Sequence, residues 1–337
     1  MATDIFYFSE RLGKLDDYTE TLIKHKPEEL VLMNHLKHTY PGMGAVRAWE
    51  RNNELEGKQV KNYAAVAEGV DKTDGYDHQA NSIIKSMLEN ARSTGYQISR
   101  EAIVLNGGRL RENELANLIR RDASDFARSI EHVIGSRQEC VQQSTTATVT
   151  KTRGLMCWLQ STAHSVMDVP AAFRPVAELS VAKDGELTED AFKAQLLKAR
   201  QNAGRALHLT GFVGLNAKLA FSDFLGRVTI VSDAKNPAKE LSQIVDFLRY
   251  DVGDVKLIAC DGLDCDTSTL EPGTLSGHSG AFLELEHFQL EFAQPITHED
   301  QTNKLDNGGG PRGFHRAMFR LNCTGLLGSF RMVKASA

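Results

Sequence analysis

The sequence predicts an α+β fold, and three observations support that class. Residues 112–135 read as one amphipathic helix of unusual length. Segments that alternate apolar and polar residues gather in the last third of the chain, most clearly over 314–323. Helical and strand-like segments are mixed without a regular strand–helix–strand alternation, which argues against a parallel α/β sheet.

Composition describes a globular chain without marked affinity for polyanions. The chain has 337 residues, 41% hydrophobic and 25% charged, enough for one large domain or two to three smaller ones. A net charge of −5 does not suggest a general binder of nucleic acid or acidic membranes. No apolar run approaches the roughly 18–20 residues that span a bilayer, and the N-terminus lacks a secretion-signal pattern. We expect a soluble chain with no membrane partner and no signal peptide.

The cysteines and histidines predict neither a disulfide framework nor a metal site. The cysteines number five, an odd count, and none are spaced C-x-x-C, so free thiols are expected. His35 and His38 lie one helical turn apart, but no carboxylate or cysteine joins them at a metal-ligand spacing. The other histidines are scattered. We therefore predict no metal and no cofactor.

The first ninety residues predict an arm followed by a long hairpin. Two short helices are expected before residue 41, the second over 27–40 with a proline at its start. They hold few core positions of their own, so they would pack on another surface. Over 42–90 the apolar content is thin, with short alternating pieces around 46–49 and 60–66. Such a long polar excursion predicts an exposed hairpin that contacts something else.

The helix over 112–135 is the predicted spine of the fold. Its apolar residues recur at three- and four-residue steps, so they share one face. Such a helix is roughly 36 Å long, enough to cross a domain, and Gly135 ends it. A polar, Thr-rich connector follows and leads into an apolar plug at 155–158. The apolar stripe consists of Leu115, Leu118, Ile119, Phe126, Ile130, Val133 and Ile134.

The second half of the chain alternates helices and strands. A helix over 189–203 is well signalled, with Thr188 as its N-cap and Gly204 as its end. A strand to about Val213 and a short helix come next. The remaining strands are expected over 243–250, 255–260, 281–295 and 314–323. In the third of these the alternation slips by one residue near 286–287, which predicts a β-bulge.

Charge is distributed unevenly toward the C-terminus. Residues 261–303 contain nine acidic residues and no Lys or Arg, whereas the chain from Asn307 onward contains five basic residues and no acid. Two interpretations are open: the segments pair within one molecule, or they form a charged surface that meets its complement on another copy.

Three local motifs lack the context that their chemistry needs. GGGPRG at 308–313 matches a dinucleotide-binding pattern, but a polar loop precedes it and a strand follows, so a flexible loop is predicted. GHSG at 277–280 lacks the second glycine of a nucleophile elbow. The acidic run at 261–266 does not fit a calcium-binding loop. We therefore expect no enzyme; the enzyme alternative is a site assembled in space around His278, Ser279 and nearby acids.

An ordered series of segments runs from residue 27 to the C-terminus. It begins with KPEELVLMNHL, AVRAWERNNEL and AVAEGVD, and continues with NARSTGYQISREAIVLNG and the long helix around ELANLIRRD. STTATVTKTRGLMCWL, LTEDAFKAQLLKARQNAG and FVGLNAKLAFSDF complete it. In this order the segments resemble those of the major capsid proteins of tailed bacteriophages, which have the Hong Kong 97 type fold.

The resemblance implies an architecture and a function. The divisions would be an N-terminal arm at 1–41, an extended loop (a β-hairpin) at 42–90, a peripheral domain at 91–154 with a spine helix at about 110–135, an axial domain with connecting strands at 155–310, and C-terminal strands at 311–337 that return to the peripheral domain. The protein would self-assemble as hexamers and pentamers into the icosahedral head shell of a tailed double-stranded DNA phage. Candidate assembly contacts are Trp49, Arg51, Tyr63, Glu68, Arg316 and Arg320.

The resemblance also implies partners and a location. The partners would be other copies of the chain, scaffolding, portal and decoration proteins, and packaged DNA held by sparse, salt-sensitive backbone contacts. The protein would reside in the virion capsid after assembly in the bacterial cytoplasm. Two alternatives remain open, an encapsulin-like nanocompartment shell protein and a ring-forming tail or neck component.

Overall fold

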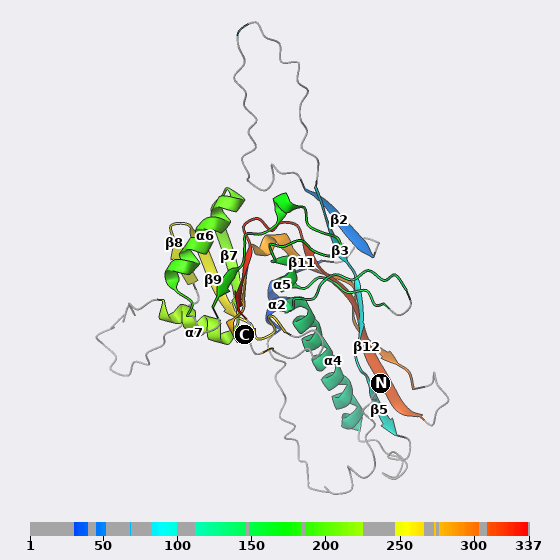
Figure 1. The fold of residues 1–337 in the computed structure, drawn as a ribbon. Coiled ribbons are helices and arrows are strands. Elements are labelled where there is room, and N and C mark those ends of the chain that lie inside the picture. The colour runs from blue at the N-terminus through cyan, green and yellow to red at the C-terminus, as the bar shows by residue number, and fades with distance from the viewer. Residues whose placement is uncertain are drawn as a thin grey trace, which may run out of the picture.

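In the residues that the structure describes, two sheets, a two-stranded ribbon and several helices, one of them 24 residues long, make up the fold (Figure 1). The structure is a computed structural model. It describes residues 30–39, 45–51, 68, 82–99, 112–145, 148–182, 186–224, 247–265, 273, 276–302 and 309–335. This mixture of helices and sheets confirms the α+β class. No helix in these ranges is both long and apolar enough to cross a membrane.

The first sheet contains the two longest strands. β11 (Phe288–Asp300) and β12 (Gly309–Cys323) pair antiparallel along most of their lengths. β1 (Lys37–Thr39) extends the sheet in parallel beside β11, and β4 (Glu89–Arg92) and β5 (Tyr96–Ser99) pair with different parts of β12. Successive side chains of a strand point to opposite faces, so one face of β12 supplies the core as predicted. That face carries Ala317, Phe319, Leu321 and Cys323, all fully buried.

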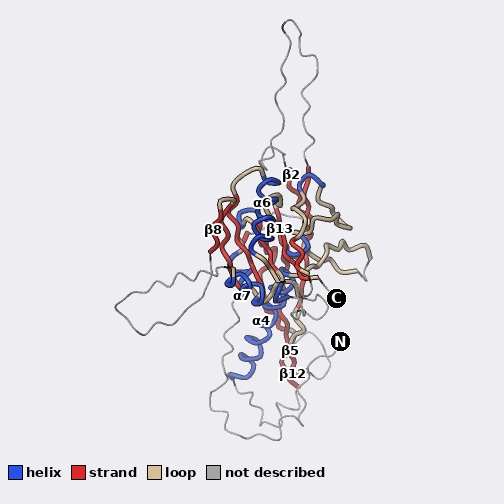
Figure 2. Tube along the Cα trace, turned by 60° about the vertical axis from the view of Figure 1, so that its left-hand side comes forward, coloured by secondary structure: helices blue, strands red, loops and turns tan. Residues whose placement is uncertain are grey.

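The predicted spine is α4 (Glu112–Gly135), which packs against β12. Its C-terminal half is built into the core, whereas its described first turns are only half-buried or exposed. In both views α4 and the paired β5 and β12 project away from the second sheet in the same direction (Figures 1 and 2). A part-buried hydrogen-bonded pair joins helix and strand, because Asp122 Oδ2 lies 2.6 Å from His315 Nδ1. The most buried apolar residues of α4 are Phe126, Ile130, Val133 and Ile134.

The plug after the connector is α5 (Leu155–Trp158), whose four side chains are all buried. Two glycines allow the backbone to pass closely here. A Cβ on Gly154 would lie 2.3 Å from the Ser136 carbonyl oxygen, and one on Gly135 would lie 2.1 Å from that of Gly262. Gly135 does end α4 as predicted, but the close approach of the loop after β9 is the physical requirement for glycine at this position.

The second sheet has six strands in the order β6-β13-β10-β7-β9-β8. It mixes directions, since β7 pairs in parallel with β9 and antiparallel with β10. The predicted strand ending at Val213 and the strand pair around residue 252 are confirmed here. The strands are β6 (Leu179–Val181), β7 (Leu207–Val213), β8 (Phe247–Tyr250), β9 (Gly253–Ala259), β10 (Gly280–Leu283) and β13 (Phe330–Lys334).

Two helices pack on this sheet through a cluster of phenylalanines. α6 (Glu189–Ala203) begins and ends at the predicted positions, and α7 (Leu215–Asp223) is the short helix expected after Val213. Phe192 of α6 is central: its ring centroid lies 4.9 Å from that of Phe221 on α7 and 5.2 Å from that of Phe282 on β10. Aromatic pairs at such separations are stabilised by offset or edge-to-face geometry beyond their burial.

The predicted ends of α6 are confirmed in detail. The Thr188 side chain accepts a hydrogen bond from the Ala191 amide at 3.4 Å, as an N-cap does. Gly204 follows the last turn with φ +71°, the left-handed conformation that glycine adopts without a Cβ clash. Local sequence signals were sufficient for this helix.

One prediction that the structure corrects is the single strand over 281–295. The chain forms β10 in the second sheet, then a 3-10 turn at Leu285–His287, then β11 in the first sheet. The slip near 286–287 therefore marks the crossing between two sheets. The register irregularities in this region lie later, between Phe292 and Thr297 of β11.

Two smaller predictions are also wrong. The helix expected over 27–40 is described only as α2 (Val31–His35), and the chain then turns into β1. α2 begins where the Glu131 carboxylate of α4 accepts hydrogen bonds from the Leu32 and Met33 amides at 2.5 and 2.9 Å. The loop expected at 308–313 is, from Gly309, the start of β12 beside β5, and Pro311 lies at an irregular register where no ladder bond is needed.

Candidate functional site

The two-stranded ribbon is the described part of the predicted long hairpin. β2 (Val46–Arg51) pairs antiparallel with β3 (Ser82–Met87), and Trp49 lies opposite Ile84. These strands frame residues 52–81, and the predicted strand piece at 60–66 lies outside the described residues. We call the ribbon β2–β3 the stem. Side-chain hydrogen bonds from both of its strands hold it to the first sheet.

A buried carboxylate, Glu291 of β11, is the centre of the anchor. The Arg320 guanidinium of β12 donates to it twice, at 2.8 and 3.0 Å, and the side chains of both residues are at most 2% exposed. Arg47 of β2 donates to the same carboxylate at 2.7 Å. The side-chain amide of Asn322 also donates to it. One carboxylate therefore joins β2 to the centre of the first sheet.

The second strand of the stem joins the same network. The Ser86 hydroxyl of β3 donates to the side-chain oxygen of Asn322 at 2.7 Å, and Ser86 is itself buried. Both strands of the ribbon are thus bonded, directly or through one residue, to Glu291. We call Glu291, Arg320, Asn322, Arg47 and Ser86 the stem anchor.

Electrostatics favour the ionised carboxylate in the stem anchor. Burial by itself would raise the pKa of Glu291, but the hydrogen bonds from Arg320 and Asn322, with the charges of Arg320 and Arg47, outweigh it and lower that pKa. A buried ion pair of this kind contributes modestly as a pair, yet losing one partner is strongly destabilising because the other charge is left buried and unpaired. The network therefore holds the stem in one position.

A second, half-buried carboxylate holds the Thr-rich connector. Glu89 of β4 accepts from the Gln138 side chain at 2.8 Å and from the Thr152 amide at 2.9 Å. The Thr152 hydroxyl in turn accepts from the Leu321 amide of β12 at 3.2 Å. Burial raises the pKa of Glu89. The connector is thus fixed along the first sheet rather than hanging free, which its polar sequence did not reveal.

The candidate assembly residues lie in different environments. Trp49 and Arg51 lie on β2 next to the stem anchor, and Glu68 is exposed. Arg316 on β12 is part-exposed and lies 3.8 Å from Glu299. Tyr63 lies outside the described residues. These five residues remain candidates for contacts with a neighbouring subunit.

The prediction that Arg320 contacts another copy is corrected by its burial inside one chain. Its guanidinium pairs with Glu291 and is not exposed to a second copy in this structure. The acidic segment and the basic tail therefore meet within one molecule at this pair and at Glu299–Arg316, as the intramolecular interpretation expects. The sequence left both interpretations open because it does not show that β11 and β12 are neighbours.

The residues of the enzyme alternative are committed to structural contacts. Ser279 is fully buried and donates to Asp264 at 2.5 Å, while the same carboxylate receives Arg137 at 2.5 and 2.7 Å. His278 instead lies 3.3 Å from the Asn216 amide nitrogen. A buried hydroxyl held by a paired carboxylate is not placed to meet a substrate.

One group of metal-type ligands was missed by the sequence. Glu139, Cys157 and His164 come together beside α5, although their separations along the chain follow no recognised metal-binding spacing. Burial raises the pKa of the Cys157 thiol to about 12. Burial would also raise that of Glu139, but its hydrogen bond to His164 and the charge of Arg153 bring it down to about 2. All five cysteines are buried free thiols, as predicted.

Comparison with known proteins identifies the family. The family model for the SU10 major capsid protein matches residues 7–307. Among solved structures, the cyanophage A-1(L) capsid is similar with a TM-score of 0.62 at 10% identity, covering 90% of this chain and 91% of that one. The cyanophage P-SCSP1u capsid has a TM-score of 0.53 at 8% identity, covering 90% and 87%.

A structure from Gordonia phage Cozz is also similar, with a TM-score of 0.51 at 13% identity, covering 91% of this chain and 87% of that one. No curated protein matches the chain. These likenesses show the Hong Kong 97 type fold that the segment order predicted. The family match covers most of the chain, and the protein therefore belongs to the SU10 major capsid protein family.

Proposed function

We propose that this capsid protein builds the icosahedral head shell of a tailed double-stranded DNA phage by assembling into hexamers and pentamers. The observation that carries the proposal is the family match over residues 7–307. The fold supports it, because the similar cyanophage A-1(L) chain forms part of a capsid and shares the architecture over 90% of this chain.

The stem anchor suits a shell subunit. A closed shell needs each copy to contact several neighbours through different surfaces, so a rigid body with a firmly held projection is useful. The stem β2–β3 leaves that body at residues 51 and 82, and the network around Glu291 fixes its position. We infer that residues 42–90 contact a neighbouring subunit, with Trp49, Arg51, Tyr63 and Glu68 among the contacting residues.

Further partners follow from the same role. Packaged DNA would contact the inner wall sparsely and through its backbone, since the chain has a net charge of −5. Scaffolding, portal and decoration proteins are the other expected partners. Assembly would take place in the bacterial cytoplasm and the product would be the virion capsid.

The alternatives are weaker. An encapsulin-like shell would differ in its contents and a tail or neck component would form open rings, and the family match favours the phage head over both. We infer that the chain is not an enzyme, because Ser279 is buried and bonded to Asp264.

The test is to express the full chain alone and examine it by size-exclusion chromatography and negative-stain electron microscopy. Closed hollow shells, or free pentamers and hexamers, support the proposal. Open rings of one size would contradict it in favour of a tail or neck component. Shells filled with a host enzyme would favour the nanocompartment. A monomer that persists at high concentration and with a candidate scaffolding protein would overturn self-assembly.

A further inference from the structure

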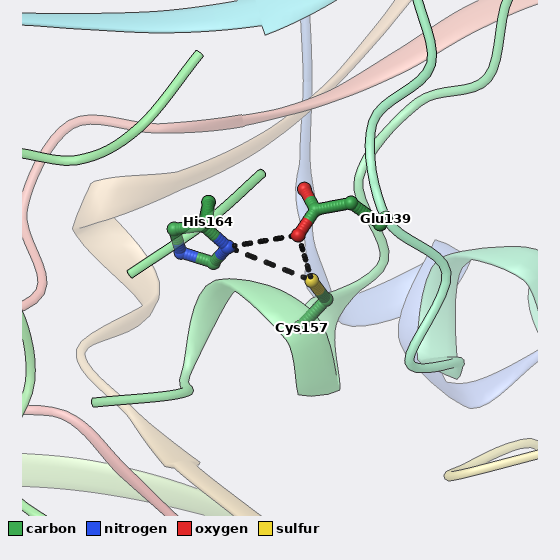
Figure 3. Close-up of side chains that lie close together, drawn as sticks. All are labelled: Glu139, Cys157 and His164. Carbon is green, nitrogen blue, oxygen red and sulfur yellow. Dashed lines mark hydrogen bonds and ion pairs between the residues drawn. The ribbon is translucent and has the colours of Figure 1, made fainter. Parts of the chain in front are cut away.

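Three side chains of the types that bind transition metals meet beside α5 (Figure 3). We call them the Cys157 cluster: Glu139 from the connector after α4, Cys157 from α5 and His164 from the loop after α5. One ligand atom from each, Glu139 Oε2, Cys157 Sγ and His164 Nδ1, lies within 4.8 Å of the other two. Cys157 and His164 are buried and Glu139 is part-buried.

The spacing of these atoms matches three corners of a tetrahedron. Cys157 Sγ lies 3.6 Å from Glu139 Oε2 and 3.8 Å from His164 Nδ1, and the oxygen and nitrogen are 3.3 Å apart. Zinc binds sulfur at about 2.3 Å and nitrogen or oxygen at about 2.0–2.2 Å, so tetrahedral ligands lie about 3.3–3.6 Å from one another. The observed triangle is close to the size that one ion requires.

Hydrogen bonds account for the sulfur less well than an ion does. A neutral thiol has a single proton and is a weak donor. Here that one weak donor has three polar neighbours, since Gln160 Oε1 lies 3.9 Å from Sγ in addition to the Glu139 and His164 atoms. The other ring nitrogen of His164, Nε2, is buried with no hydrogen-bond partner in the described structure, so the cluster is what engages this ring. A single cation bound to Glu139 Oε2, Cys157 Sγ and His164 Nδ1 would satisfy these three atoms together.

Gln160, which contacts both Cys157 and His164, is the candidate for a fourth ligand. Its side-chain nitrogen is 2.9 Å from His164 Nδ1. The oxygen and nitrogen of such an amide exchange places by a half-turn of its terminal group, so its oxygen reaches the same position. Either that oxygen or a water molecule would complete a four-coordinate site.

The carboxylate is already oriented for this role. Arg153 donates to Glu139 Oε1 at 3.0 Å, which leaves Oε2 facing the cluster. The Arg153 guanidinium stacks 4.5 Å from the Trp158 ring centroid and donates to the Val166 carbonyl at 2.6 Å. Groups that hold a ligand in position before the ion arrives raise metal affinity, and Arg153 is such a group.

We propose that Glu139, Cys157 and His164 bind one zinc ion, or a closely related thiophilic divalent cation, as a structural site. A thiolate with an imidazole selects such ions over magnesium and calcium, which prefer oxygen ligands alone. The thiolate and the carboxylate together carry two negative charges toward the ion, and the carboxylate also pairs with the Arg153 guanidinium. The ion ties the connector, α5 and the loop after α5 into one unit, and this role does not depend on shell assembly.

The experiment measures zinc directly on the full-length chain. Purified protein is treated with a chelator, returned to zinc chloride and dialysed, and bound zinc is measured by mass spectrometry and titration calorimetry. We expect about one zinc per chain and a higher melting temperature with zinc, because an ion that binds only the folded state stabilises it. Cys157→Ser and His164→Gln should each weaken binding by more than about 100-fold.

The matched control is Cys265→Ser, which alters another buried thiol outside the cluster. It should bind zinc like the parent chain. Zinc binding that is unchanged in Cys157→Ser and His164→Gln would overturn the proposal and indicate an adventitious ion only.

If either variant fails to fold, the absorption spectrum of cobalt(II) bound to the parent chain shows whether Cys157 is a ligand. A tetrahedral spectrum with a thiolate-to-cobalt charge-transfer band is expected. A spectrum without that band excludes Cys157 as a ligand and overturns the proposal.

Discussion

The guanidinium of Arg320 and the carboxylate of Glu291 form a doubly hydrogen-bonded ion pair buried between neighbouring strands, at 2.8 and 3.0 Å. Arg47 reaches the same carboxylate from the hairpin stem. One carboxylate therefore takes part both in an interaction within the sheet and in the interaction that positions the ribbon β2–β3. Its removal should affect both stability and assembly.

Replacing Glu291 by glutamine should destabilise the subunit. Glu291→Gln leaves Arg320 buried without its counter-charge, which costs about 3–5 kcal/mol of unfolding free energy. Denaturant unfolding of the unassembled chain measures it. The control is Glu299→Gln, whose partner Arg316 is part-exposed at 3.8 Å and whose loss should change stability by less than about 1 kcal/mol. Equal effects in the two variants would show that Glu291 is no special anchor.

The contribution of Glu291 should disappear in acid. Its pKa in the fold lies below its ordinary value of 4.5, so the ionised form is favoured by folding. That stability is fully present above pH 4.5 and is lost as the pH falls through the lower folded pKa. The gap in unfolding free energy between the parent chain and Glu291→Gln should therefore narrow with acid. A difference in unfolding free energy that stays constant to low pH would contradict the lowered pKa of Glu291.

Glu131 should contribute to the unfolding free energy with the opposite pH dependence in the same experiment. Burial raises its pKa above 4.5, although the Leu32 and Met33 amides partly offset this. Protonation is then favoured by folding, so the parent chain gains stability relative to Glu131→Gln as the pH falls from neutral through the raised pKa toward 4.5. Denaturant unfolding should show that, in acid, the difference in unfolding free energy from the parent chain shrinks for Glu291→Gln and grows in the parent's favour for Glu131→Gln.

Loosening the stem without unfolding the subunit should reduce assembly. In Arg47→Ala the Glu291 carboxylate keeps Arg320 and Asn322, so subunit stability should fall by only about 1 kcal/mol. Shell yield, counted by electron microscopy, should fall by more than about tenfold because each contact is repeated many times. Lys85→Ala, at an exposed position on β3, serves as the control. Full shell yield in Arg47→Ala would show that the stem anchor has no role in assembly.

A methyl group at Gly135 should disrupt the end of the spine helix. The new Cβ would lie 2.1 Å from the Gly262 carbonyl oxygen, and both partners are backbone, so neither moves easily. We expect Gly135→Ala to lower the unfolding free energy by about 3 kcal/mol or more. At Gly273 the nearest atom to an added Cβ is 3.8 Å away, so Gly273→Ala should be nearly neutral. Thermal unfolding of both variants compares them, and a neutral Gly135→Ala would contradict the close approach.

The elements that the sequence predicted best are those whose signals are local. α4 and α6 were predicted with their bounds because helical hydrogen bonds join residues four apart, and the apolar period, the Thr188 cap and Gly204 all lie within the element. The buried face of β12 followed from simple alternation. The order of such segments was also enough to identify the capsid fold.

What the sequence alone did not determine is which elements lie side by side. The apolar pattern over 281–295 is the same whether the strand continues or crosses to another sheet, and only packing assigns β10 and β11 to different sheets. The burial of Arg320 depends in the same way on β11 lying beside β12.

The candidate sites show the same division. Glu291 meets Arg47 across 244 positions of sequence, and Glu139 meets Cys157 and His164 across connectors with no characteristic spacing. Residue types and local periods are sequence properties, because they depend on near neighbours along the chain. The stem anchor and the Cys157 cluster were decided by tertiary structure, because burial and distance between remote segments are set only when the whole core packs.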